Sequence, residues 1–152
     1  MFASRKFRDV FSELNAGLPP AVYAAGSSIG SALTMTGRNK MVFHLDAGSG
    51  GAASARMLFY AASASTGTGS TLVASTGLLF ASATSASGGT LVAEIRGEFL
   101  GNQSTGPWLF PVLSVSGASV VAGVHANGFV EHYAPASYND TAAYVQLENT
   151  FF

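Results

Sequence analysis

The most constraining feature of this sequence is an alternation of large apolar side chains with other residues, found in two neighbouring runs. Met41, Phe43 and Leu45 occupy every second position of the first run. Residues 56–60 form the second run, and a glycine- and serine-rich stretch lies between the two. Successive side chains of a β-strand point to opposite faces, so two such runs joined by a turn-like stretch are typical of antiparallel pairing. We therefore expect a β-hairpin over residues 40–61.

The same alternation returns in residues 91–100, the clearest strand pattern of the sequence. Its odd positions hold apolar or small residues, which are expected to face the core. Glu94, Arg96 and Glu98 then share the solvent face. Two carboxylates at this spacing resemble a catalytic pair, but the arginine between them favours an ion-pair ladder, which contributes little to stability.

Further short strands are predicted at 108–115, 119–125 and 129–133. Pro111 has no N–H to donate to a neighbouring strand, so we expect its strand at a sheet edge or at a bulge. Asn127 and Gly128 form the strongest short turn signal in the chain.

The strand count defines the fold class that we expect. About seven to nine short strands with turn signals between them are typical of an all-β antiparallel sandwich or a jelly-roll-like barrel. Helices and strands do not alternate along the chain, so a parallel sheet is not expected.

Residues 1–20 differ from the rest of the chain. Aromatic and charged residues are mixed there at spacings that predict a short amphipathic helix, ended by Gly17 and Pro19, or an arm that docks on a neighbouring subunit. We therefore divide the chain into an N-terminal arm, 1–20, and a β-sandwich domain, 21–152. The domain includes an Ala/Ser/Gly-rich segment, 62–90, in which only brief strands and long surface loops are expected.

Composition restricts the possible partners. Only 10% of the 152 residues are charged, 48% are hydrophobic, and the net charge is -1. A surface so poor in charge suggests that partners cover much of it. Seven lysines and arginines are too few for a nucleic-acid-binding patch, and no apolar run is long enough to span a membrane. We expect neither a nucleic acid nor a membrane as partner, and no export signal.

We find no pattern of catalytic, cofactor-binding or metal-binding residues, and we expect no enzymatic activity. His44, His125 and His132 share no metal-ligand spacing, and the chain has no cysteine. No nucleophile lies in a recognisable catalytic motif. Three aromatic residues are candidates for stacking on sugars if they are exposed: Trp108, Tyr60 and Tyr133. A carbohydrate-binding or adhesin-like β-sandwich module is therefore the alternative to the function that the resemblance described next implies.

Several short motifs that begin within residues 37–136 occur together in one family. They are the strand and glycine turn at 41–48, the run 56–60, the segments 67–74 and 92–100, and His132-Tyr133-Ala134-Pro135-Ala136-Ser137. With these motifs the chain resembles the head decoration, or cement, proteins of tailed bacteriophages, which are small β-sandwich virion proteins. The segment 62–90 departs from that pattern.

The resemblance implies a structural protein that binds the outside of a phage capsid and clamps neighbouring major capsid subunits. It implies the major capsid protein and further copies of the chain, as a homotrimer, as partners. It also implies the virion surface as location, after synthesis in the host cytoplasm. The residues expected to bind partners are those of an N-terminal arm and a docked C-terminal tail: Phe2, Arg5, Phe7, Phe11, Phe151 and Phe152.

Overall fold

The computed structural model describes residues 11–36, 38, 40–48, 53–79, 88–96, 106–129 and 149–151, with backbone alone at 11–13 and 149–151. These residues form ten strands and no helix. The strands are β1 (Phe11–Tyr23), β2 (Gly26–Ile29), β3 (Leu33–Thr34), β4 (Lys40–Ala47), β5 (Ala53–Ala62), β6 (Thr71–Ser75), β7 (Gly89–Arg96), β8 (Trp108–Gly117), β9 (Val120–Phe129) and β10 (Asn149–Phe151).

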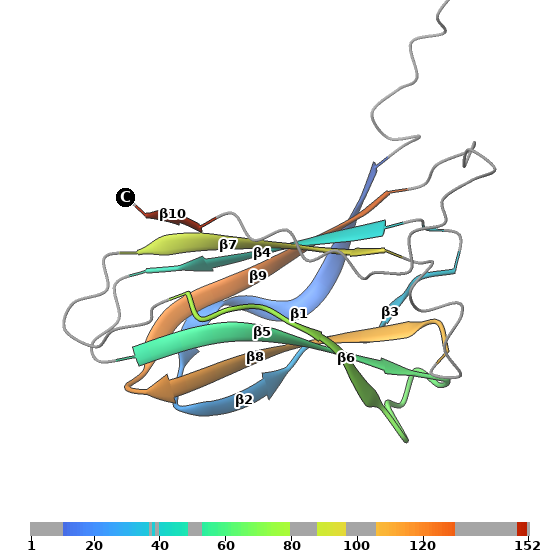
Figure 1. The fold of residues 1–152 in the computed structure, drawn as a ribbon, viewed down its shortest axis with the longest axis horizontal. Helices are drawn as coiled ribbons and strands as arrows, with labels where there is room; N and C mark the ends of the chain where they lie inside the picture. The colour runs from blue at the N-terminus through green and yellow to red at the C-terminus, as the bar shows by residue number, and fades with distance from the viewer. Residues whose placement is uncertain are drawn as a thin grey trace, which may run out of the picture.

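The strands form two antiparallel sheets that face each other (Figure 1). Sheet A has the order β1-β9-β4-β7-β10, and sheet B has the order β2-β8-β5-β6, with β3 also paired to β8. The prediction of an all-β antiparallel sandwich is therefore confirmed. The predicted strand 129–133 lies outside the described residues except for Phe129.

The predicted hairpin over residues 40–61 is wrong, although both of its strands exist. β4 lies in sheet A between β9 and β7, whereas β5 lies in sheet B between β8 and β6. The connection between β4 and β5 therefore crosses from one sheet to the other. Alternation fixes which face of a strand is buried, but it does not fix which strand lies beside it.

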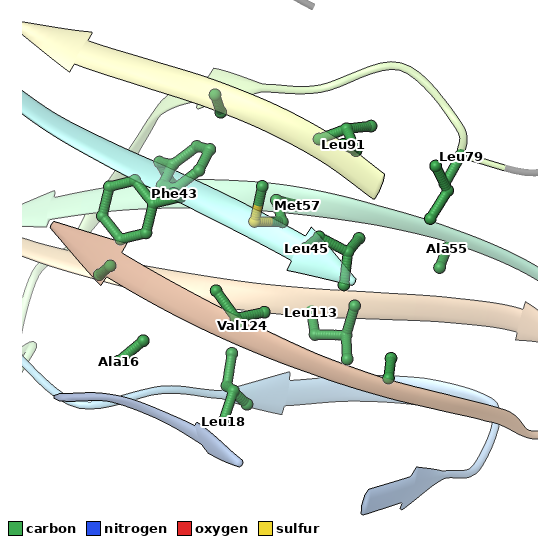
Figure 2. Packing of buried hydrophobic residues seen from close by; sticks show 14 of the residues in the cluster. Ala16, Leu18, Phe43, Leu45, Ala55, Met57, Leu79, Leu91, Leu113 and Val124 are labelled. Atoms are coloured by element: carbon green, nitrogen blue, oxygen red, sulfur yellow. The ribbon is translucent and has the colours of Figure 1, made fainter. Parts of the chain in front are cut away.

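The core lies between the two sheets and is built from alternate residues of the facing strands (Figure 2). Phe43 of β4 and Phe59 of β5 are both fully buried, and their ring centroids lie 4.8 Å apart at a tilt of 53°. Tilted aromatic pairs at such a distance are favourable beyond the area that they bury. Leu91, Ala93 and Ile95 of β7 face this core, as predicted.

The predicted helix is wrong over residues 11–20, because they belong to strand β1, which pairs with β9. Residues 1–10 lie outside the described part. The pairing shifts register between Leu14 and Leu18 and again before Ala21, and Gly17 has a φ of 71°. The prolines of β1 are tolerated because β1 is an edge strand and its ladder is irregular beside them.

Pro111 lies in β8, an interior strand of sheet B, and not at an edge or bulge as predicted. Its carbonyl accepts a hydrogen bond of 2.8 Å from the Gly30 N–H. In an antiparallel ladder the nitrogen and carbonyl of one residue point toward the same neighbour. The Pro111 nitrogen, which carries no hydrogen, therefore faces the break between β2 and β3, where no ladder bond is required.

The turn predicted at Asn127 and Gly128 is also wrong. Both residues lie inside β9, where Asn127 is opposite Val42 of β4 and Glu13 of β1. Because β9 has a partner on each side, the ladder bonds of two neighbouring strands hold this stretch extended despite its local preference for a turn.

Two contacts close the sides of the sandwich. On the side of β1, the Ser31 N–H donates to the Ala16 carbonyl at 2.8 Å, which ties the edge of sheet A to the segment after β2. A Cβ on Gly30 would lie only 2.2 Å from the same carbonyl oxygen, so this closure requires glycine. On the other side, Leu79 is buried near Leu91 and Ala55 (Figure 2).

The buried hydroxyl of Thr76 holds the segment that leads to Leu79. Its Oγ1 accepts a hydrogen bond of 2.9 Å from the Met57 N–H and donates one of 2.9 Å to the Gly77 carbonyl. The brief strand β6, which precedes this segment, agrees with the expectation of short strands in 62–90. Residues 80–87 lie outside the part of the chain that the structure describes.

We predict that Thr76→Val lowers the free energy of unfolding by about 1–3 kcal/mol, because it leaves the buried Met57 N–H without a partner at nearly constant side-chain volume. Urea unfolding followed by circular dichroism measures the difference. Thr76→Ser keeps the hydroxyl and is the control. Equal stability of the valine variant and the wild type would contradict this role.

Candidate protein-binding surface

The outer face of sheet B carries an apolar cluster that crosses four strands. Leu109 and Leu113 of β8 point into the core, so Phe110 and Val112 point outward. Their cross-strand partners on this side extend the cluster. We call it the sheet B apolar face, and its members are Ile29 of β2, Leu58 and Tyr60 of β5, Leu72 of β6, and Phe110 and Val112 of β8.

The register explains why the cluster is continuous. Val112 is opposite Ile29 on one side and Leu58 on the other, and Tyr60 is opposite both Phe110 and Leu72. Directly opposed side chains of neighbouring strands contact one another. Val112 is consequently only 5% exposed, whereas Ile29 at the sheet edge is 71% exposed and Leu72 is 48% exposed.

Polar residues border this face at one end. Ser114 of β8 is opposite Arg56 of β5 and Ser27 of β2, and one step further Ser54 and Ser116 form a hydrogen bond. An apolar centre with a polar border is the usual pattern of a protein–protein contact.

Trp108 also lies on the outward side of β8, because its neighbour Leu109 is fully buried in the core. Tyr60 is its diagonal neighbour across the β5–β8 pair, at a Cα separation of about 7–8 Å. Both side chains are half-buried, so each presents part of its ring to solvent. Tyr133, the third aromatic considered for sugar stacking, lies outside the described residues.

The outer face of sheet A is mainly polar where β4 and β7 meet. Glu94 accepts hydrogen bonds from Arg96 Nε at 3.0 Å and from Lys40 Nζ at 3.3 Å. The predicted ion pair between Glu94 and Arg96 is thus confirmed. Glu98 lies outside the description, and sequence alone missed Lys40, because its place beside Glu94 depends on the pairing of β4 with β7.

A shallow hollow of about 430 Å³ lies on the same outer face, where β1, β4, β7 and β9 come together. Pro20 covers Gly123 there, since a Cβ on Gly123 would lie 3.1 Å from the proline ring. Asp46 and His125 line the hollow, and Asp46 accepts a hydrogen bond of 2.7 Å from the Thr90 hydroxyl. One carboxylate and one imidazole do not form a nucleophile–base–acid set.

Tyr23 supports the bulged part of β1 beside this hollow. Its hydroxyl donates a hydrogen bond of 2.7 Å to the Pro19 carbonyl. Burial raises the pKa of Tyr23, because desolvation disfavours the phenolate. The phenol is therefore neutral at physiological pH and has a structural role in β1.

Of the residues predicted to bind partners, the described part of the chain includes Phe11 and Phe151, and it does not bring these two together. Phe2, Arg5, Phe7 and Phe152 lie outside the described residues. Phe11 begins β1 opposite Phe129, and Phe151 lies in β10 opposite Gly89. These two pairs occupy opposite edges and opposite ends of sheet A, so Phe11 and Phe151 are not neighbours in the sheet (Figure 1).

Two of the three histidines are brought together by the fold. His44 of β4 and His125 of β9 are directly opposite each other in the register, although their separation in sequence gave no reason to pair them. His132 lies outside the described residues. No cluster of three or more His, Cys, Asp or Glu residues suited to a metal ion occurs in the part of the chain that the structure describes.

The described residues contain no helix that is long and apolar enough to cross a membrane. Comparisons of the whole chain with protein-family models, with curated proteins and with solved structures found no match.

Proposed function

We propose that this chain is a structural virion protein that binds the outside of a phage capsid and stabilises it by clamping neighbouring major capsid subunits. The observation that carries the proposal is the sheet B apolar face. Two of its members, Ile29 and Leu72, are exposed large apolar side chains of a domain that has few charges to keep it soluble, as expected of a surface that is covered in the working assembly.

The shape of this face suits a wide, flat partner. It is formed by side chains of four strands of one sheet, with a register shift between β5 and β6 at Tyr60, and its two most exposed members, Ile29 and Leu72, lie on the two edge strands of sheet B. A sheet face contacts a large protein surface without a conformational change, which lowers the entropic cost of binding. A protein that binds only the assembled shell stabilises it by mass action.

The face makes a sharp test possible, because the two sheets offer matched positions. Ile29 of sheet B and Val22 of β1, in sheet A, are 71% and 70% exposed, and both are β-branched. We predict that Ile29→Asp lowers the affinity for expanded empty heads by at least about tenfold, because burying an unpaired carboxylate is costly. We expect Val22→Asp to bind like the wild type. Cosedimentation with heads assembled from the major capsid protein of the same genome measures both affinities.

Unfolding midpoints and sedimentation of the free variants serve as controls. Since Ile29 is largely exposed, Ile29→Asp is expected to fold normally. Equal head binding by both variants would contradict the assigned face. If Ile29→Asp instead converts a trimer into monomers, the face is the contact between subunits and not the contact with the capsid.

A second prediction concerns the N-terminal arm. Residues 11–14 pair with β9, so a truncation that tests the arm must end before Phe11. We predict that deleting residues 2–10 weakens binding to heads while leaving the unfolding midpoint of the sandwich unchanged. Deleting 2–14 is expected to lower that midpoint as well, because it removes four register pairs of β1. Full occupancy of heads by the shorter truncation would rule out the arm.

Carbohydrate binding is a second candidate function, favoured by the diagonal placement of Tyr60 and Trp108 on the outer face of sheet B. Aromatic rings on one sheet face are suited to stacking on sugar rings. A glycan array probed with the purified protein tests this candidate. If the chain is a cement protein, no glycan is expected to bind. A glycan signal that is lost in Tyr60→Ala, in a variant that remains folded, would replace the capsid proposal.

A further inference from the structure

The pairing of β4 with β9 sets His44 and His125 at a definite separation. The Gly48 N–H donates to the Val121 carbonyl at 2.8 Å, just beyond the pair Ala47 and Ala122. This bond makes Gly48 and Val121 a hydrogen-bonded pair of the ladder. Hydrogen-bonded pairs recur at every second position of an antiparallel ladder, so the pair His44–His125, four positions away, is also a hydrogen-bonded pair. Its Cα atoms are therefore about 5.5 Å apart.

Both imidazoles lie on the outer face of sheet A. Phe43 and Leu45, the neighbours of His44, are fully buried, and so are Val124 and Ala126 on either side of His125, to within 5% exposure. Alternation then directs both histidines away from the core. His125 is exposed and His44 is half-buried, and within the described part of the chain neither ring has a hydrogen-bond or ion-pair partner.

We infer that His44 and His125 form a two-imidazole site for a divalent transition-metal ion such as Zn²⁺ or Ni²⁺. Neutral imidazole nitrogens are good ligands for these ions, and two that point from neighbouring positions of a sheet can chelate a single ion. Water completes the coordination shell, because no cluster of three or more His, Cys, Asp or Glu suited to a metal ion occurs among the described residues, and the nearby Asp46 carboxylate accepts a hydrogen bond from the Thr90 hydroxyl.

The position of the site defines its effect. β4 and β9 are neighbouring interior strands of sheet A, and an ion held between them cross-links segments that are distant in sequence. An ion that binds the folded chain and not the unfolded one raises stability by mass action. The inference does not depend on the proposed capsid function.

Titration of tag-free protein with ZnCl₂ or NiCl₂ by isothermal calorimetry tests the site. We expect one ion per chain, and we expect His44→Ala and His125→Ala each to weaken binding by about a hundredfold, because either change removes the chelate. Two controls should keep the wild-type affinity: His132→Ala, which changes the remaining histidine, and Asn127→Ala, which changes the same face two residues from His125. Thermal unfolding with and without Zn²⁺ gives a second readout. The metal is expected to raise the Tm of the wild type and of both controls, but not the Tm of His44→Ala or His125→Ala.

Two outcomes would overturn the inference. If His44→Ala and His125→Ala bind the ion as tightly as the wild type, the ligands lie elsewhere. If each variant loses part of the stoichiometry at unchanged affinity, the histidines bind ions independently and no chelate exists. Wild-type unfolding midpoints of the metal-free variants show that either result concerns binding and not folding.

Discussion

The structure depends on the burial of alternate side chains of β4 and β5 against each other across the sandwich. Among the described residues, Phe43 and Phe59 contribute the two largest fully buried groups, and they come from strands that are close in sequence but lie in opposite sheets. Each strand also occupies an interior position in its sheet. Removing either ring would therefore disturb both layers, because the two rings contact each other across the core.

The remaining strands are arranged so that irregular features fall where the ladders allow them. The prolines of β1 lie on an edge strand with shifted register, and Pro111 faces the break between β2 and β3. Pro20 folds over Gly123 on the outer side of sheet A, and Gly30 allows the Ala16 carbonyl to approach closely. Each of these features is accommodated because the residue opposite it is small or because no ladder hydrogen bond is required at that position.

Much of the fold class was predictable from sequence, whereas strand partners were not. Alternation identified the buried faces of β4 and β7, because burial acts on each strand separately. The partner of a strand depends on residues far away in sequence, so the expected hairpin proved to be a crossing between sheets. Asn127 and Gly128 show the same limit, since pairing on both sides of β9 overrides their local preference for a turn.

The candidate surface was less predictable for the same reason. Ile29, Leu58 and Leu72 come from three strands, and no local pattern indicates that the register places them on one face. The low charge of the chain did suggest covered surface, but not where it lies.

The interior position of β9 in sheet A, beside β1, also has a consequence for biosynthesis. β1 pairs with β9 from Phe11 opposite Phe129 to Tyr23 opposite Val120, so the first described strand waits for almost the last described segment before it gains its neighbour. Loop closure over such a span makes folding slow. On the ribosome, the nascent chain would hold β1 and the exposed side of β4 unpaired until β9 emerges, and a chaperone that shields strand edges would be most useful during that interval.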